Sequence, residues 1–572
     1  MERPEPNRNY KFVGQSASQR WDFLSMPYLF ERAGLDLDSP GVVFEGSSRT
    51  YGELRDASRR IANGLVGLGL EELDRVAILA VNRLEFIEIE VGIAAARAIM
   101  VPLNWRLREG ELANLLRRSQ AKAIFVDERF LPTILALRRS GEVPELRTII
   151  TIDDGVADLS YEELLRSSSN ERPTRTGQLD DPHEIIFTSG TTGQPKGVVW
   201  TNGSVLWNSI QQIVDFQLGP QSSTHVVIDL YYIGGRHDFT WGILQQGGTV
   251  HIERSSGFDA GETLRYVADH QITHVLWVPT MLYDIFRLPN LEDFDLSALK
   301  MIMCGGQPVS AATTSRAQEV FPTTDFIQVY GLTEGGGTVT FVPPQDAHRK
   351  PGSAGKASMH AEIRLEALDG SEVAPGGDGE ILVRAPSVTA GYWDDPEMTD
   401  EMIVDGWLHT GDMGRFDDEG YLYISGRKGD MIISGGMNIF PSEIEAVLRE
   451  HATVSDAAVV GLPDEKWGEI VCAVVEAAPG SIVDERAIID YCTERLASYK
   501  KPRSVKVIDE LPRTPSGKLK KFLLREQFSN QEPSLELSSM TERLSHRTVV
   551  GDGAARQSQH LDPPSSAQEK ND

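Results

Sequence analysis

The sequence predicts an α/β protein with a large N-terminal domain of doubly wound, mainly parallel sheets and a small, separate C-terminal α/β domain. Strand-like apolar runs alternate with helix-period stretches from Tyr51 to Val126, and the alternation resumes after Gly197. This alternation is typical of βα units. The chain of 572 residues also exceeds the size at which one hydrophobic core keeps growing, so two or more domains are expected.

Local patterns place the elements in chain order. Helical periodicity covers 54–68 and 204–216, and apolar runs predict strands at 75–80, 123–126, 184–187, 273–278, 299–303 and 326–329. Residues 355–425 are rich in Gly, Asp and short alternating runs, which predicts a β-rich subdomain. After Gly429 a compact α/β segment runs to about Arg525.

We therefore divide the chain into a polar N-terminal extension (1–20), an N-terminal domain (21–428), a C-terminal lid domain (429–527) and a tail (528–572). The tail is rich in Ser, Gln, Glu and Asp and has few apolar clusters, so it is predicted to be disordered.

Composition narrows the classes of function. The net charge of −28 argues against a nucleic-acid surface and against binding to anionic membranes. No apolar run is long enough to cross a bilayer, and the N-terminus lacks the apolar core of a secretion signal. Three widely spaced cysteines (Cys304, Cys472 and Cys492) favour a reduced, cytoplasmic protein over a disulfide framework or a zinc site. The oligomeric state stays open, with a homodimer as one option.

A glycine- and threonine-rich stretch, 187–197, is the most informative part of the chain. It follows the apolar run 184–187 and ends with Lys196 and Gly197. Closely spaced backbone N–H groups and hydroxyls can surround an anion, because glycine lets the backbone approach closely. The spacing is not that of a Walker loop, since Val198 follows Gly197. Alone, the stretch fits a surface turn equally well.

Four further motifs follow in order: 330–334 (Tyr-Gly-Leu-Thr-Glu), 407–412 (Trp-Leu-His-Thr-Gly-Asp), 426–439, which contains Arg427 and a second glycine pair, and 512–518, which ends at Lys518. Together with the glycine-rich stretch they resemble the adenylate-forming superfamily of acyl-CoA synthetases, luciferases and peptide-synthetase adenylation domains. The resemblance runs from about Tyr51 to Arg525. Five motifs in the right order and spacing make chance agreement very improbable.

The resemblance implies a role for each motif, with ATP, Mg²⁺ and coenzyme A as the bound groups. The implied residues are Ser189, Gly190, Thr191, Thr192, Gly193 and Lys196 for phosphate; Thr188 and Glu334 for Mg²⁺; Tyr330, Gly305, Gly306 and Gln307 for adenine, with Gly331 and Thr333 as further nucleotide-binding residues of the Tyr330 motif; Asp412 and Arg427 for ribose or phosphate; and Ser434, Gly435, Gly436 and Asn438 for pantetheine. The competing interpretations are a turn for the threonines, a core position for the tyrosine and surface ion pairs for the charged residues.

Lys518 is implied to be the catalytic lysine that bridges the carboxylate substrate and the α-phosphate, carried by a mobile lid. The family rotates this lid about a hinge residue that is usually acidic or a lysine; here Gly429 stands there. Basic residues exceed acidic ones between Lys500 and Arg525, which fits either a solvated helix face or attraction for the polyphosphate of coenzyme A.

The expected acyl-binding region departs from the family pattern. Tyr232 stands where relatives commonly have histidine, and Asp229 replaces proline. Our alignment does not put Asp229 at the position that pairs with an α-amino group, which disfavours an amino-acid substrate. The proposed substrate residues are Tyr232, Gly234, His237 and Asp238. Nearby aromatic residues suggest an aromatic or cyclic carboxylic acid, with a medium-chain acid as the next choice.

The sequence therefore predicts an ATP-dependent carboxylic acid–CoA ligase. The enzyme would form an acyl-adenylate with release of pyrophosphate and then an acyl- or aryl-CoA thioester. One alternative is an amide-forming ligase, in which Asp229, His237 or Asp238 would deprotonate an amine. A non-catalytic acyl-adenylate sensor is the third, disfavoured because both Glu334 and Lys518 are retained. The amide-forming alternative would use the same adenylation chemistry as the CoA ligase.

Overall fold

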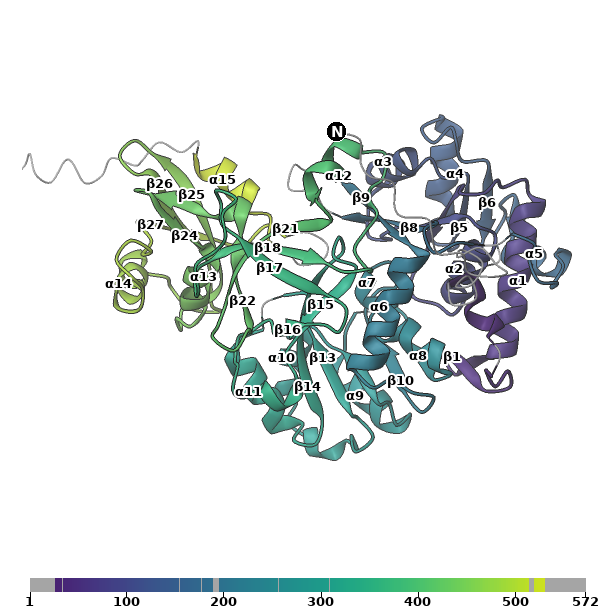
Figure 1. Cartoon of the computed structure of the whole chain (residues 1–572), viewed down its shortest axis with the longest axis horizontal. Coiled ribbons are helices and arrows are strands. Elements are labelled where there is room, and N and C mark those ends of the chain that lie inside the picture. The colour runs from purple at the N-terminus through teal and green to yellow at the C-terminus, as the bar shows by residue number, and fades with distance from the viewer. Residues whose placement is uncertain are drawn as a thin grey trace, which may run out of the picture.

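The computed structural model describes residues 26–529 apart from 33, 154, 176, 189–194, 256, 308 and 514–518. It confirms the α/β class. The described strands form four sheets, and the small C-terminal sheet lies at one end of the long axis, beyond β17, β18 and β21 (Figure 1). Residues 1–20 and 530–572 lie outside the described part, whereas Phe528 and Ser529, assigned above to the tail, end a helix.

The first two sheets carry the parallel βα units that the sequence predicts. One has the strand order β19-β9-β8-β4-β3-β5-β6-β7, and the other β16-β15-β14-β13-β12-β10-β11-β1-β2. Their bounds are β1 (Pro40–Phe44), β2 (Ser47–Thr50), β3 (Arg75–Leu79), β4 (Ile99–Pro102), β5 (Ala123–Val126), β6 (Thr148–Thr151), β7 (Leu159–Ser160), β8 (Pro182–Thr188), β9 (Lys196–Thr201), β10 (Ser223–Val226), β11 (Thr249–Ile252), β12 (His274–Leu276), β13 (Met301–Cys304), β14 (Asp325–Leu332), β15 (Gly337–Phe341), β16 (Lys356–Ala357) and β19 (Gly391–Tyr392).

The other two sheets are mainly antiparallel. The β-rich sheet contains β17 (Glu362–Glu366), β18 (Gly379–Arg384), β20 (Ile403–Val404), β21 (Trp407–Phe416) and β22 (Leu422–Arg427). The C-terminal sheet contains β23 (Ile432–Ser434), β24 (Met437–Ile439), β25 (Val454–Asp464), β26 (Gly468–Ala477) and β27 (Ser504–Ile508), and it has an apolar core of its own.

The α-helices of the described residues are α1 (Tyr51–Gly67), α2 (Glu85–Ala95), α3 (Glu109–Ser119), α4 (Leu131–Ser140), α5 (Tyr161–Ser167), α6 (Asn202–Asp215), α7 (Ile233–Arg236), α8 (Thr240–Gln246), α9 (Ala260–Asp269), α10 (Pro279–Phe286), α11 (Ala311–Val320), α12 (Pro396–Met402), α13 (Pro441–Arg449), α14 (Glu485–Arg495) and α15 (Lys521–Ser529). None of these helices in the described part of the chain is long and apolar enough to span a membrane.

Two predicted boundaries shift for identifiable reasons. Helix α1 begins at Tyr51 rather than at residue 54, because Thr50 and Glu53 form a reciprocal capping box at its N-terminus. The strand predicted to end at Val329 continues to Leu332, because β14 turns from its parallel neighbour β13 to pair antiparallel with β15.

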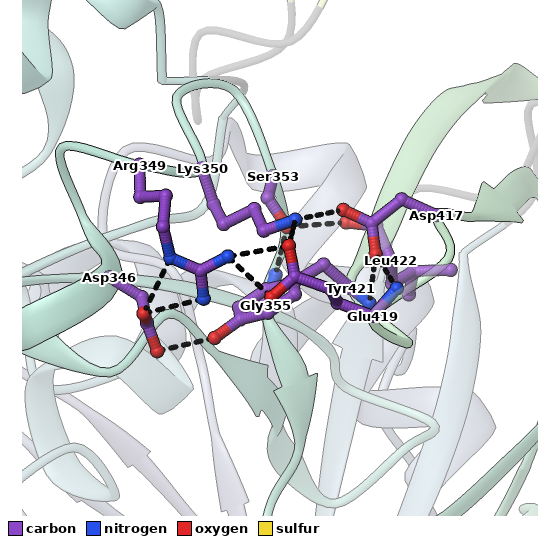
Figure 2. Close-up of polar contacts among 9 residues, drawn as sticks. All are labelled: Asp346, Arg349, Lys350, Ser353, Gly355, Asp417, Glu419, Tyr421 and Leu422. Atoms are coloured by element: carbon purple, nitrogen blue, oxygen red, sulfur yellow. Dashed lines mark hydrogen bonds and ion pairs between the residues drawn. The ribbon is translucent and has the colours of Figure 1, made fainter.

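The turn that joins β21 to β22 is fastened to the loop after β15 by a polar cluster that we call the hairpin clamp (Asp346, Arg349, Lys350, Asp417, Glu419 and Tyr421) (Figure 2). The Lys350 ammonium lies 2.6 Å from both the Asp417 Oδ2 and Glu419 Oε1 atoms. The Tyr421 side chain is buried, and its hydroxyl donates to Asp346. The clamp therefore fixes the end of the hairpin formed by β21 and β22.

Tyr421→Phe removes this buried hydroxyl and leaves the Asp346 carboxylate without one donor. We expect the variant to lose about 1 kcal/mol of stability, measured as a lower urea midpoint. Tyr423→Phe is the matched control, since Tyr423 lies two residues later, on β22, and its hydroxyl has no hydrogen bond to the described residues. Equal midpoints for the two variants would contradict a stabilising role for the clamp.

Candidate active site

The adjacent strands β21 and β22 bring two of the predicted nucleotide ligands together. Asp412 and Arg427 are partners in the strand register, and Arg427 Nε lies 2.7 Å from Asp412 Oδ1. The Tyr330 hydroxyl, from β14, donates to Asp412 Oδ2 at 2.8 Å. Asp412 is buried, so its two oxygens are held in a fixed orientation. They accept two separate donors, which is the geometry that two neighbouring hydroxyls of a ribose require.

Charge favours this arrangement. Burial and the adjacent Asp412 carboxylate raise the pKa of Tyr330 well above its usual range, so the phenol stays a neutral donor. Desolvation opposes the charge on Arg427, but Asp412 and the more distant Glu334 are among the groups that raise the pKa of Arg427 overall. The guanidinium therefore remains charged while it is paired with Asp412.

Glycine is required at the turn after β13. A side chain at Gly305 would place its Cβ atom 2.5 Å from Val329 Cγ2, whereas a Cβ at Gly306 would meet no heavy atom within 4 Å. Gly306 also has a φ angle of +78°, which favours glycine. Gly306 and Gln307 are exposed, so this turn offers bare backbone next to β14. Gly331 is equally constrained, because a Cβ there would lie 2.0 Å from the Gly337 carbonyl oxygen.

A second group of predicted ligands surrounds a residue that the sequence analysis missed. The Tyr392 hydroxyl donates to Glu334 Oε1 at 3.1 Å, and the Lys196 ammonium lies 5.2 Å from the centre of the Tyr392 ring. The Thr333 carbonyl accepts a hydrogen bond from Trp200 Nε1 at 2.8 Å, which ties the 330–334 motif to β9. In the sheet, Tyr392 pairs with Val198 of β9, directly after the glycine-rich stretch. In the sequence, the adjacent aromatic residues Tyr392 and Trp393 are the signal that could have pointed to it.

The antiparallel pair β8–β9 carries the two ends of the glycine-rich stretch. Thr188 and Lys196 are register partners at the ends of these strands, so the intervening residues must begin and end at one point of the sheet. The predicted phosphate ligands Ser189, Gly190, Thr191, Thr192 and Gly193, together with the catalytic Lys518, lie outside the described residues.

The donors present fit a magnesium ion held by few protein ligands. Glu334 is half-buried and uses one carboxylate oxygen to accept from Tyr392. The described residues contain no group of three or more His, Cys, Asp or Glu side chains that could hold a metal. Mg²⁺ typically binds one or two carboxylates and keeps several waters or substrate phosphates, so one acidic ligand is sufficient.

His237 is not available to a substrate, which corrects the sequence-based assignment. Its side chain is buried, and Nε2 lies 2.6 Å from Glu184 Oε1. The neighbouring Arg236 is fully buried as well, and it contacts Glu184 and lies 3.1 Å from Glu90 Oε2 through Nε. Burial lowers the pKa of His237, so the imidazole is neutral and acts as a structural partner of β8.

Asp229 is also occupied, because its carboxylate accepts from three side chains. Trp105 Nε1 lies 3.3 Å from Oδ1, Ser255 donates to the same oxygen, and Arg106 pairs with Oδ2. A carboxylate with these partners is not a free base. The base role that the amide-forming alternative gave to Asp229 or His237 is therefore not supported by the geometry.

Tyr232, Gly234 and Asp238 remain accessible. All three are half-buried, and the Tyr232 ring packs on Tyr231 with 4.2 Å between ring centres. Asp238 follows α7 and makes no side-chain hydrogen bond or ion pair to the described residues. Burial raises the pKa of the Asp238 carboxyl to about 7.

The predicted pantetheine residues form the β23–β24 hairpin of the C-terminal sheet. Ser434 is buried, whereas Gly435, Gly436 and Asn438 are exposed. A Cβ atom at Gly435, where φ is +59°, would lie 2.7 Å from the Trp467 ring, so this turn needs glycine. These residues belong to a different sheet from Asp412 and Arg427.

Ion pairs account for part of the basic run between Lys500 and Arg525. Four of its members pair with carboxylates after residue 428: Lys500 with Glu443, Arg513 with Asp456, Lys521 with Glu445 and Arg525 with Asp430. These four charges therefore connect elements of the C-terminal domain, a role that differs from both a solvated helix face and attraction for coenzyme A.

Taken with the two large sheets and the β-rich sheet that precede residue 428, this site defines an adenylate-forming enzyme. A family model described as AMP-binding enzyme matches residues 29–393, and a model of the AMP-binding enzyme C-terminal domain matches residues 443–518. The chain belongs to the AMP-binding enzyme family.

Known relatives cover most of the chain. An indoleacetate–CoA ligase from Aromatoleum aromaticum is 36% identical over 503 residues, which are 87% of this chain and 97% of that protein. The crystal structure of an anthranilate CoA ligase in complex with anthranoyl-AMP superposes with a TM-score of 0.79 and 26% identity, and covers 88% of this chain and 97% of that one. The structure of an amide bond synthetase from Marinactinospora thermotolerans superposes with a TM-score of 0.78 and 27% identity, and the match covers 88% of this chain and 100% of that one.

The raised pKa of Asp238 predicts a pH-dependent stability. An unfolded Asp loses its proton near about pH 4, whereas the folded chain keeps it to about pH 7. The folded state therefore binds more protons in this window, and its stability falls as the pH rises through it. Asp238→Asn should melt at a higher temperature than the parent at about pH 8 and at the same temperature near about pH 4, with at most about 4 kcal/mol involved.

Asp325→Asn is the matched control for this measurement, because Asp325 is exposed at the start of β14. If Asp238→Asn differs from the parent by the same amount at both pH values, Asp238 does not titrate as its burial requires.

Proposed function

We propose that the protein is an ATP-dependent carboxylic acid–CoA ligase. It activates the acid as an acyl-adenylate with release of pyrophosphate, and then transfers the acyl group to the thiol of coenzyme A with release of AMP. The observation that carries this proposal is the pairing of Tyr330 and Arg427 on the two oxygens of Asp412. Glu334 acts electrostatically on the same Arg427 and accepts from Tyr392, whose ring lies near Lys196. Membership of the AMP-binding enzyme family supports it.

Each part of the site has a role in this reaction. Tyr330 and the Gly305–Gln307 turn would flank adenine, and Asp412 would take the ribose hydroxyls from its present partners. Mg²⁺, held through Glu334 and Thr188, would supply positive charge to the phosphates. Lys196 and the 189–194 stretch would bind the departing pyrophosphate, and Lys518 would offset the charge that gathers between carboxylate and α-phosphate.

We infer that the substrate is an aromatic or cyclic carboxylic acid, and a medium-chain acid is the second choice. The half-buried Tyr232 and Gly234 would line its site, with Asp238 beside them. The three cysteines are all buried and free, which supports a reducing compartment such as the cytoplasm. Asp229 and His237 are both engaged, which leaves the amide-forming alternative with Asp238 as its only remaining base among those named above.

The test is to follow AMP release and loss of the free CoA thiol over a panel of carboxylic acids, with the parent protein and Lys518→Met. We expect both products with the parent. The variant should form acyl-adenylate slower by orders of magnitude but still make thioester from supplied acyl-AMP. Lys520→Met removes the same charge two residues away and should resemble the parent. Equal loss in both half-reactions would contradict the role of Lys518, and AMP release without thiol loss would contradict the ligase.

The hinge gives a separate prediction. A Cβ atom at Gly429 would meet no heavy atom within 4 Å, so Gly429→Ala should fit this conformation. Gly429→Pro fixes φ near about −65° and restricts the preceding residue. If the lid rotates between half-reactions, the proline variant should release pyrophosphate at the parent rate while thioester formation falls by an order of magnitude or more. Parent-like thioester formation by the proline variant would make rotation unnecessary.

A further inference from the structure

Asp238 lies close to Gly234 of α7, in the segment between β10 and β11. A Cβ atom at Gly234 would lie 3.4 Å from Leu276 Cδ2, 3.7 Å from Asp238 Oδ2 and 3.8 Å from Ile228 Cδ1. Two aliphatic side chains and one carboxylate oxygen thus come within van der Waals distance of the half-buried Gly234. We call these four residues the Gly234 face. Its composition suits a ligand that is mostly apolar and has one polar atom.

Strand order sets the separation of this face from the nucleotide residues. Leu276 ends β12, the Gly305 turn follows β13, and Tyr330 lies on β14, three successive neighbours in one sheet. Ile228 follows β10, which pairs with β12 on its other side. Neighbouring strands are about 4.8 Å apart, so the Gly234 face lies roughly 10 Å from Tyr330 along the sheet edge. That distance suits the ring of an acid whose carboxylate reaches the α-phosphate.

The Asp238 carboxylate is unusual here because no described residue donates to it. Asp229, nine residues earlier, accepts from three side chains, whereas only burial acts on the pKa of Asp238, raising it to about 7. Asp238 is half-buried, and a ring that covers it would leave the carboxylate without a hydrogen-bond partner, which is unfavourable. A donor on a bound ligand would supply the missing hydrogen bond.

We propose that Asp238 is a specificity-determining residue that selects carboxylic acids with an N–H or O–H donor on the ring distal to the carboxylate. This inference rests on the proposed function, since it assumes that the acid occupies the Gly234 face. The aliphatic side chains of Ile228 and Leu276 hold the ring, and the Asp238 oxygen accepts from its donor. Acids of the same shape without the donor leave the carboxylate unpaired, and sites of this kind discriminate strongly against such analogues.

The test compares matched acids that differ only in the donor. Suitable pairs of similar size are indole-3-acetate with 1-benzothiophene-3-acetate and 4-hydroxycinnamate with 4-fluorocinnamate. At about pH 8, where Asp238 with its pKa of about 7 is mostly ionised, we expect kcat/KM of the parent for AMP release to favour the donor acid of at least one pair by about 10- to 100-fold, the effect of one hydrogen bond to a charged group. Asp238→Ala should bring this ratio close to one. The kcat/KM ratio of Asp238→Asn should lie between those of the parent and Asp238→Ala, because the amide oxygen still accepts a hydrogen bond.

Asp325→Ala, at the opposite end of the same sheet, should keep the parent ratio. Dissociation constants for the same pairs, measured by calorimetry, separate this inference from the proposed function. A binding preference that Asp238→Ala abolishes supports the inference even if no acid is turned over. If the parent and Asp238→Ala turn over the acids with the same kcat/KM ratio between donor and donor-free acids, the inference is wrong and the proposed ligase function still stands. A parent that shows no preference within any pair, in binding or turnover, also overturns it.

Discussion

A fully buried arginine ties the segment after β10 to the strand that leads into the glycine-rich stretch. Arg236 bridges Glu90 on α2 and Glu184 on β8, and its Nη1 atom donates to the Leu230 carbonyl at 2.7 Å. Removing one partner from such a buried pair typically costs about 3–5 kcal/mol, so the geometry is strongly enforced. Because Glu184 lies on the strand before the glycine-rich stretch, the position of that stretch depends on the segment that also carries Gly234 and Asp238.

The nucleotide side depends on a second constraint, the hairpin of β21 and β22. One end of the hairpin is fixed by the clamp around Tyr421, and its strands carry Asp412 and Arg427 as register partners. Glu380, on the adjacent β18, accepts from the backbone N–H of Gly411 at 3.2 Å. The orientation of the Asp412 carboxylate is therefore set by packing around the hairpin before any nucleotide binds, which reduces the ordering that binding requires.

Residues that act through local backbone could be predicted from the sequence, and residues that act through distant partners could not. The glycine turns and the Asp412 motif are contiguous patterns whose conformation follows from short-range rules, and the structure places them on or just after strands as expected. Arg236 meets Glu184 and Glu90 from far along the chain, which no local pattern encodes. For the same reason His237 was assigned to the substrate and Tyr392 was missed, since burial and sheet pairing decide both.

The contacts near residue 429 explain how the C-terminal domain could change its orientation relative to the nucleotide-binding residues. Lys428 Nζ lies 2.8 Å from Glu380 Oε2 and so stays with the β-rich sheet, whereas Asp430 pairs with Arg525 and stays with the C-terminal domain. The two anchors lie on either side of Gly429, the one residue between them. A change in the dihedral angles of Gly429 would therefore leave both ion pairs intact, because each pair remains within its own rigid part. The energetic cost of reorienting the C-terminal domain then falls on the few contacts between α13 and β22, such as the Ser442 hydroxyl donating to the Ser425 carbonyl.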